Sequence, residues 1–172
     1  MASSGEDVTT TKPLYKGSCH CGFVSYTVGL DLVNPSPETG SVVTKCNCSI
    51  CHKSGTVLAI PSPGSLKLLS PPEGRAALQD YVFDTGNVHH WLCPKCGIKC
   101  FLEGCLTYQG QEIKFTRINV LTLDEKEDGS PLEDLRQLKP LYWDGKSISW
   151  DGDVPKGAPK EASKEPGEGG IW

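Results

Sequence analysis

The stretch Cys93-Pro-Lys-Cys96-Gly97 has the form of a zinc-knuckle turn, in which two cysteines enclose two residues and a glycine follows. The two-residue spacing lets backbone amides donate hydrogen bonds to the first sulfur, and the glycine permits the tight turn. One such turn supplies two of the four ligands that a tetrahedral zinc ion needs. The chain must therefore provide two more ligands from elsewhere.

The stretch Cys19-His-Cys-Gly22 is the best source of those ligands, because it also ends in glycine and precedes a predicted strand. Residues two apart on an extended strand point to the same face, so its two sulfurs lie on one side. His20, between them, should point away from their metal. We therefore predict a closed structural zinc site that contributes to folding and has four thiolate ligands: Cys19, Cys21, Cys93 and Cys96.

A third group, Cys46-Asn-Cys48-Ser-Ile-Cys51, offers three thiolates and has no fourth cysteine at a similar spacing. Catalytic zinc sites are built from three protein ligands and an open position. The group therefore predicts a second zinc that leaves room for water or a substrate thiolate. The alternative is a structural site closed by Cys100, Cys105, His52 or a nearby histidine. If they do not close this site, Cys100 and Cys105 are expected to be ordinary buried or surface thiols.

Four side chains are candidate substrate contacts for this second site. Lys45 and Lys53 flank it and would offset its negative charge or bind a substrate carboxylate, unless they are simply exposed lysines. His52 follows the last cysteine directly and is a candidate for lining the open site. His90 is the fourth candidate. On a strand it faces the side opposite to His89, so at most one of the two looks toward a given metal; the alternative is a packed or solvent-facing histidine.

Composition limits the other functional classes. The 172 residues carry a net charge of −4, whereas binding to nucleic acid needs a basic face. We therefore expect no nucleic-acid partner. The first residues contain no apolar run, and no window reaches the length of a membrane-spanning helix. We therefore expect a cytoplasmic protein with no membrane partner. The nine cysteines are an odd number and would stay reduced there, which favours metal ligation over disulfides.

Between its ends the chain reads as short strands broken by turn residues. One short helix is predicted at 130–138, with Ser130 as its cap, Pro131 in its first turn and Glu133 in the capping-box position. These patterns predict a mainly β domain over 14–150, between a flexible leader at 1–13 and a flexible or surface-draped tail at 151–172. The predicted strands are 23–30, 41–48, 56–61, 66–70, 81–83, 88–93, 98–104 and 112–123.

Three blocks, GSCHCGFVSY (17–26), KCNCSICHKSG (45–55) and VHHWLCPKCGIKCF (88–101), closely resemble the glutathione-dependent formaldehyde-activating enzyme family, also called the centromere-protein-V-like domain family. The later INVLTLDE (118–125) resembles its closing strand. The resemblance covers about 14–123 and extends to about 150. It implies an Mss4-like fold of antiparallel β-sheets around two zinc ions. One zinc would be held by Cys19, Cys21, Cys93 and Cys96, and the other, at the active centre, by Cys46, Cys48 and Cys51.

The resemblance also implies a function. The family's namesake activity is that of a carbon–sulfur lyase, joining glutathione to formaldehyde as S-hydroxymethylglutathione or cleaving that conjugate. Glutathione or another thiol conjugate would then be the small-molecule partner, with a homodimer left open. The alternative is a non-catalytic zinc-binding interaction module, like the centromere-associated relatives or the Mss4-type chaperones. A third interpretation is thiol redox chemistry or zinc storage through Cys100 and Cys105.

Overall fold

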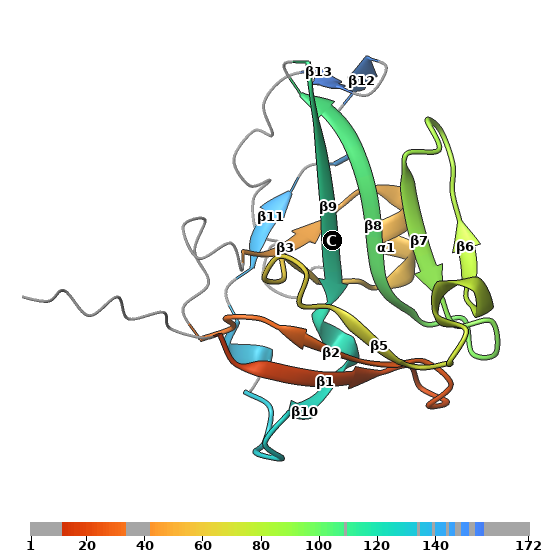
Figure 1. The fold of residues 1–172 in the computed structure, drawn as a ribbon. Coiled ribbons are helices and arrows are strands. Elements are labelled where there is room, and N and C mark those ends of the chain that lie inside the picture. Colours follow the sequence, from red (N-terminus) through yellow and green to blue (C-terminus); the bar gives the residue numbers. More distant parts are fainter. Residues whose placement is uncertain are drawn as a thin grey trace, which may run out of the picture.

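The computed structural model describes residues 12–33, 42–108, 110–133, 135–138, 140–143, 145–146, 149–151 and 154–156. Within them the fold is mainly β, as predicted, with a four-stranded, a seven-stranded and a two-stranded sheet. In Figure 1 the strands of the four-stranded sheet lie below the larger sheet and run across the direction of its long strands. No helix of the described part is long and apolar enough to cross a membrane.

The four-stranded sheet has the order β10-β1-β2-β5. Alternation along β1 and β2 buries Tyr15, Tyr26 and Val28 completely, as a strand with one face on the core requires. Gly17 is paired with Tyr26, and a Cβ at Gly17 would lie 2.4 Å from the Tyr26 ring, so only glycine fits there. The strands are β1 Leu14–Ser18, β2 Ser25–Gly29, β5 Lys67–Ser70 and β10 Leu123–Lys126.

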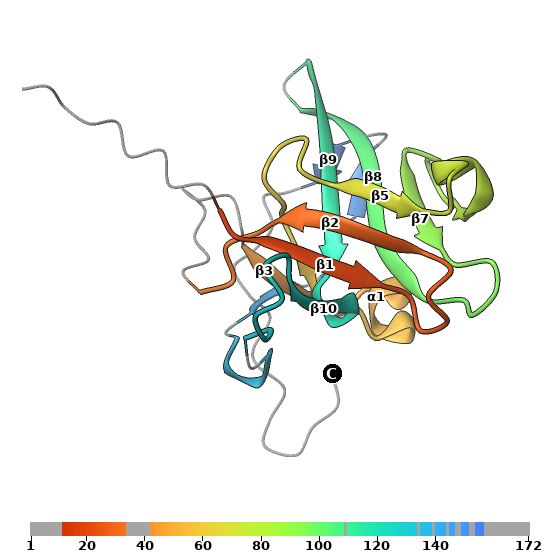
Figure 2. The ribbon, with the colours of Figure 1, turned by 60° about the horizontal axis from the view of Figure 1, so that its bottom comes forward.

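The seven-stranded sheet has the order β11-β3-β4-β9-β8-β7-β6, and all of its pairings are antiparallel except that of β11 with β3. Figure 2 shows its long β8–β9 hairpin rising from the smaller sheet. The strands are β3 Val43–Cys46, β4 Leu58–Ala59, β6 Gln79–Tyr81, β7 Val88–Leu92, β8 Lys99–Tyr108, β9 Gln111–Asn119 and β11 Leu141–Trp143. The separate two-stranded sheet pairs β12 Ser149–Asp151 with β13 Val154–Lys156.

The two faces of the larger sheet cover different apolar clusters. Phe101 and Ile118 pack into the main core with the buried residues of the smaller sheet. Leu102, the next residue of β8, points to the other face and packs with Leu58 and Cys51. The helix α1, Ser49–Ser54, packs into that second, smaller cluster through Ile50 and Cys51. This packing positions the three-cysteine group described below.

The short helix is not where the sequence predicted it. Residues 130–138 form no α-helix in the part described: only a 3₁₀ turn, η3 Leu135–Gln137, is present. Pro131 instead forms a β-bridge with Glu125, and the Glu133 carboxylate lies 2.7 Å from the Lys126 ammonium. These residues therefore bind to β10 rather than cap a helix. The other 3₁₀ turns are η1 Gly74–Ala77 and η2 Val120–Thr122, and η2 interrupts the strand predicted at 112–123.

The predicted leader, 1–13, lies outside the described residues except for its last two, and the predicted tail outside them except for 151 and 154–156. Among the latter, Asp151 of β12 pairs with Val154 of β13.

Candidate metal centres

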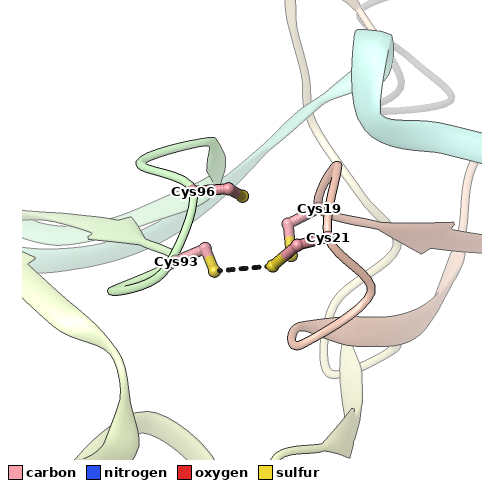
Figure 3. Close-up of side chains that lie close together, drawn as sticks. All are labelled: Cys19, Cys21, Cys93 and Cys96. Atoms are coloured by element: carbon pink, nitrogen blue, oxygen red, sulfur yellow. Dashed lines mark hydrogen bonds between the residues drawn. The ribbon is translucent and has the colours of Figure 1, made fainter.

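Four cysteines from two distant turns meet at one end of the molecule. Cys19 and Cys21 lie between β1 and β2, whereas Cys93 and Cys96 lie between β7 and β8 (Figure 3). All four sulfurs are within 4.8 Å of one another, and Cys21 Sγ is 3.6 Å from both Cys19 Sγ and Cys93 Sγ. Sulfurs around a tetrahedral zinc, at about 2.3 Å each, would be about 3.8 Å apart. The spacing fits zinc and is far from a disulfide bond, and all nine cysteines are free.

In both turns the glycine amide donates to the carbonyl of the first cysteine, three residues back in the first turn and four residues back in the second. The amide of Gly22 donates to the carbonyl of Cys19 at 3.0 Å, and that of Gly97 donates to the carbonyl of Cys93 at 2.9 Å. Both glycines have φ of +74°, a left-handed conformation that a residue with a Cβ rarely adopts. The glycine that follows each cysteine pair in the sequence therefore has the turn-forming role expected of it.

Backbone amides surround the sulfurs of this four-cysteine cluster. The Val24 amide donates to Cys19 Sγ at 3.2 Å. Burial raises the pKa of Cys93 to about 12, against the opposing effect of two amide donors. Burial also raises the pKa of Cys96, but amide donors from Ile98 and Cys21 outweigh it and bring the value to about 6. A bound divalent metal would supply the positive charge needed to hold all four groups as thiolates.

The second cluster forms where β3 meets α1. Cys46 ends the strand, Cys48 is the N-cap of the helix and Cys51 lies in its first turn. Residues three apart on a helix share a face, which brings Cys48 and Cys51 together. Gly55, with φ of +60°, ends the helix. The three sulfurs lie within 4.8 Å of one another, so the group is suited to hold a metal ion.

This local geometry differs from the expected one in one respect. The sequence placed Cys46 and Cys48 on one continuous strand at 41–48, whereas β3 ends at Cys46. Cys48 keeps an extended backbone, with φ of −61° and ψ of 155°, and its amide donates to Cys46 Sγ at 3.4 Å. The two sulfurs therefore still meet, although a strand does not hold them there.

The three thiols are electrostatically unequal. The hydrogen bond between the side chains of Cys46 and Cys48 raises the pKa of Cys46 and lowers that of Cys48. The backbone amides of Ile50 and Cys51, at the start of α1, also lower the pKa of Cys48. Cys48 is therefore the thiolate that accepts from its neighbour, and zinc binding would release the remaining thiol protons.

In the described part of the chain, no further His, Cys, Asp or Glu belongs to this cluster. Cys100 is 1% exposed in the main core, where burial raises the pKa of its thiol to about 12. Cys105 is half-buried further along β8. His52 is on the exposed side of α1. None of these residues joins Cys46, Cys48 and Cys51, so within the described residues the group offers three candidate ligands.

A cavity of about 430 Å³ adjoins the three-cysteine cluster. Its apolar lining comes from Ile50, Phe83, Val88 and Trp143, and this size and character are typical of small-molecule sites. A second hollow, lined by Lys53 and Tyr81, shares Ser49, Ile50 and Phe83 with it. The remaining lining residues of the main cavity are Cys46, Cys48, Asp84, Thr85, His90, Gly145 and Lys146.

Of the four candidate contacts, His90 lines the main cavity and Lys53 lines the adjoining hollow, whereas Lys45 and His52 line neither. His90 is 3% exposed, and its ring stacks on Phe83 with centroids 5.5 Å apart. Burial, aided by the Lys99 charge, lowers the pKa of His90 to about 4, so its imidazole is neutral at pH 7. His89 faces the opposite side of β7, as expected, and its Nδ1 lies 2.7 Å from an Asp80 carboxylate oxygen.

Sequence reasoning missed the segment that forms one wall of this cavity. β11 runs parallel to β3 and places Trp143 opposite Cys46. The Asn47 amide donates to the Trp143 carbonyl at 3.1 Å. A Cβ on Gly145 would lie 2.4 Å from Cys46 Sγ, so the backbone there contacts the cluster directly. The residues 140–146 carry turn and strand signals, but nothing in them indicates that they pair with β3.

Sequence reasoning also missed Lys99, the first residue of β8. The pairing of β7 with β8 shifts register between Trp91 and Leu92, so Leu92 faces Lys99 while Trp91 faces Phe101. This bulge places Cys100 in the main core and turns Lys99 toward the three-cysteine cluster. Burial lowers the pKa of Lys99, and the cluster's thiols, Cys51 foremost, oppose that shift.

The family described as glutathione-dependent formaldehyde-activating enzyme matches residues 14–137. Among solved structures, a crystal structure of a Rhodobacter sphaeroides protein is 29% identical, with a TM-score of 0.45. The match covers 63% of this chain and 86% of that one.

Proposed function

Because the chain belongs to the glutathione-dependent formaldehyde-activating enzyme family, we propose that it is a zinc-dependent carbon–sulfur lyase or synthase acting on glutathione or a glutathione conjugate. One observation carries this proposal. Cys46, Cys48 and Cys51 form a three-sulfur cluster, and two of these residues also line a cavity of small-molecule size. The four-cysteine cluster has a full set of ligands and would serve the fold.

In this proposal Cys46, Cys48 and Cys51 would hold one zinc ion, and a substrate sulfur in the adjoining cavity would be its fourth ligand. When bound, zinc would lower the pKa of a substrate thiol at that position and so supply a thiolate at neutral pH. In the synthase direction a carbon–sulfur bond forms between this sulfur and an aldehyde carbon, and the carbonyl oxygen takes up a proton. In the lyase direction the hydroxyl gives up its proton, the carbon–oxygen double bond forms again, and the sulfur leaves with the electron pair of the broken carbon–sulfur bond.

The cavity supplies contacts that match the other parts of glutathione. Lys146 lies at the main cavity and Lys53 at the adjoining hollow, and each ammonium suits one of the two carboxylates of the tripeptide. Asp84, in the lining of the main cavity, suits its ammonium group. Phe83, Ile50 and Trp143 give the cavity an apolar lining that a substrate would cover on binding.

His90 is the side chain best placed to contact the reacting groups. It lines the cavity beside Cys46 and Cys48. Since a neutral imidazole carries one donor and one acceptor nitrogen, it can hold a hydroxyl or carbonyl oxygen without adding charge. We assign it the orientation of the aldehyde oxygen. The Phe83 ring stacks on the imidazole, with centroids 5.5 Å apart and planes 17° apart, which favours one orientation of the His90 ring.

The decisive experiment measures catalysis directly. Exchange NMR follows the interconversion of glutathione and formaldehyde with S-hydroxymethylglutathione, with and without the zinc-loaded protein. We expect the wild type and the control Cys105→Ser to accelerate this exchange above its spontaneous rate, and Cys46→Ser to lose the effect. No acceleration by the wild type, with both zinc sites loaded, would remove formaldehyde and glutathione as its substrates. Equal acceleration by Cys46→Ser would place the activity elsewhere.

A further inference from the structure

Lys99 is a buried cation that no described group neutralises by a hydrogen bond. Its side chain is 4% exposed, and its Nζ has no hydrogen-bond partner among the described residues. Burial of an ammonium group without a partner is strongly unfavourable, so such groups are normally paired with an anion. The position of Lys99 therefore indicates that negative charge gathers beside it in the functional protein.

The source of that charge is the three-cysteine cluster. The charged groups that act on Lys99 are the thiols of Cys51, Cys48 and Cys46, in that order. On the neighbouring strand β7, His90 also faces this region, but it is neutral. Lys99 itself is not among the residues that line the cavity.

Lys99 changes the net charge of the three-cysteine zinc site. Three thiolates around a divalent zinc leave a net charge of about −1, and the nearby ammonium cancels it. With an anionic fourth ligand, the net charge of the zinc site together with Lys99 would be about −1, whereas without Lys99 it would be about −2. A neutral fourth ligand would gain nothing from the ammonium. The difference between the two matters here because Lys99 and Cys51 are buried, and charges interact more strongly in a buried place than in water.

We propose that Lys99 is a positioning residue whose charge makes the open position of the three-cysteine zinc site prefer an anionic ligand, such as a thiolate, over a neutral one. The inference rests on the proposed zinc site and deepens the proposed function, because it assigns the preference for thiolate to a residue outside the ligand set. Lys99 acts through the cluster and does not touch substrate.

The test uses cobalt-substituted protein, in which the visible absorption reports ligands added to the metal. Azide and glutathione are the anionic probes and imidazole is the neutral one. We expect Lys99→Met to weaken azide and glutathione binding by roughly tenfold or more, while imidazole binding changes less than about twofold. Lys99→Arg should restore most of the loss. The exposed Lys114→Met, on β9, serves as the control and should behave as the wild type.

Other outcomes would overturn the inference. If Lys99→Met bound all three probes equally more weakly than the wild type, Lys99 would have a structural role only. If it bound them as tightly as the wild type, the charge of Lys99 would have no effect on ligand binding. If wild-type protein binds azide but not glutathione, the proposed function fails, and the comparison of azide with imidazole still decides the role of Lys99. Failure of every probe to bind the wild type overturns both. Lys99→Gln replaces the methionine variant if the latter does not fold with a full complement of cobalt.

Discussion

The backbone amide of Lys146 donates a hydrogen bond of 2.8 Å to the side-chain oxygen of Asn47, which lies between two cysteines of the three-cysteine cluster. Together with the bond from the Asn47 amide to the Trp143 carbonyl, it holds Trp143, Gly145 and Lys146 against the cluster. This wall lies beyond residues 14–137, the part that the family matches. The chain therefore closes its cavity with a segment outside the matched region.

Gly145→Ala tests the closeness of that wall. The added Cβ would lie 2.4 Å from Cys46 Sγ and 3.0 Å from the Cys48 Cβ, so the wall or the ligands must move. We expect a loss of about 1–3 kcal/mol, typical of overpacking, in the free energy of zinc binding to the three-cysteine cluster. Competition with a chromophoric chelator measures it. An unchanged affinity would show that the wall does not contact the loaded cluster.

The two cysteine clusters should differ in their effect on stability. Cys93→Ser removes a ligand that connects β7 and β8 to the β1–β2 turn, and we expect it to lower the free energy of unfolding by more than about 3 kcal/mol. Cys46→Ser disrupts only the junction of β3 and α1 and should cost less. Urea denaturation of both variants decides this. A greater loss in Cys46→Ser would reverse the two assignments.

Cys100→Ala tests whether the buried thiol has a ligand role. Because Cys100 packs in the main core and belongs to neither cluster, its loss should cost roughly 1 kcal/mol of stability from the small cavity left behind. Zinc content should stay at the wild-type value. A fall in zinc per chain, measured by elemental analysis, would show that Cys100 takes part in metal binding.

The pH dependence of His90 follows from its burial. Its pKa is lowered to about 4, whereas the unfolded chain would have the ordinary value of about 6.5. The stabilisation from keeping this ring neutral is therefore fully present above about pH 6.5 and declines as the pH falls toward 4. We expect the His90 ring signals of the zinc-loaded protein to remain those of a neutral imidazole at pH 5.5 in NMR titrations. A midpoint near 6.5 would contradict its buried state.

The cysteine clusters could be predicted from the sequence because their spacing carries the geometry. Glycines after Cys21 and Cys96 mark the turns, and pairs two or three residues apart can share a face. The strands followed from alternation, as in Tyr26 and Val28 of β2. The helix was misplaced for a physical reason: the capping residues Ser130, Pro131 and Glu133 formed contacts with β10 instead.

The missed features depend on tertiary structure. The helix α1 has only six residues and is stabilised where Cys48 and Cys51 pack beside Leu58 and Leu102, which no local pattern reveals. Lys99 faces the cluster only because a bulge shifts the register of β7 and β8. Gly145 reaches Cys46 only because β11 pairs with β3. None of these relationships is visible in spacing along the chain.

Native mass spectrometry of the zinc-loaded protein tests the unequal division of the seven cysteines most directly. We expect two zinc ions per chain in the wild type, one in Cys46→Ser, and a glutathione adduct only on the species that carries two. One zinc ion in the wild type, or a glutathione adduct that survives in Cys46→Ser, would contradict an open metal site at Cys46, Cys48 and Cys51.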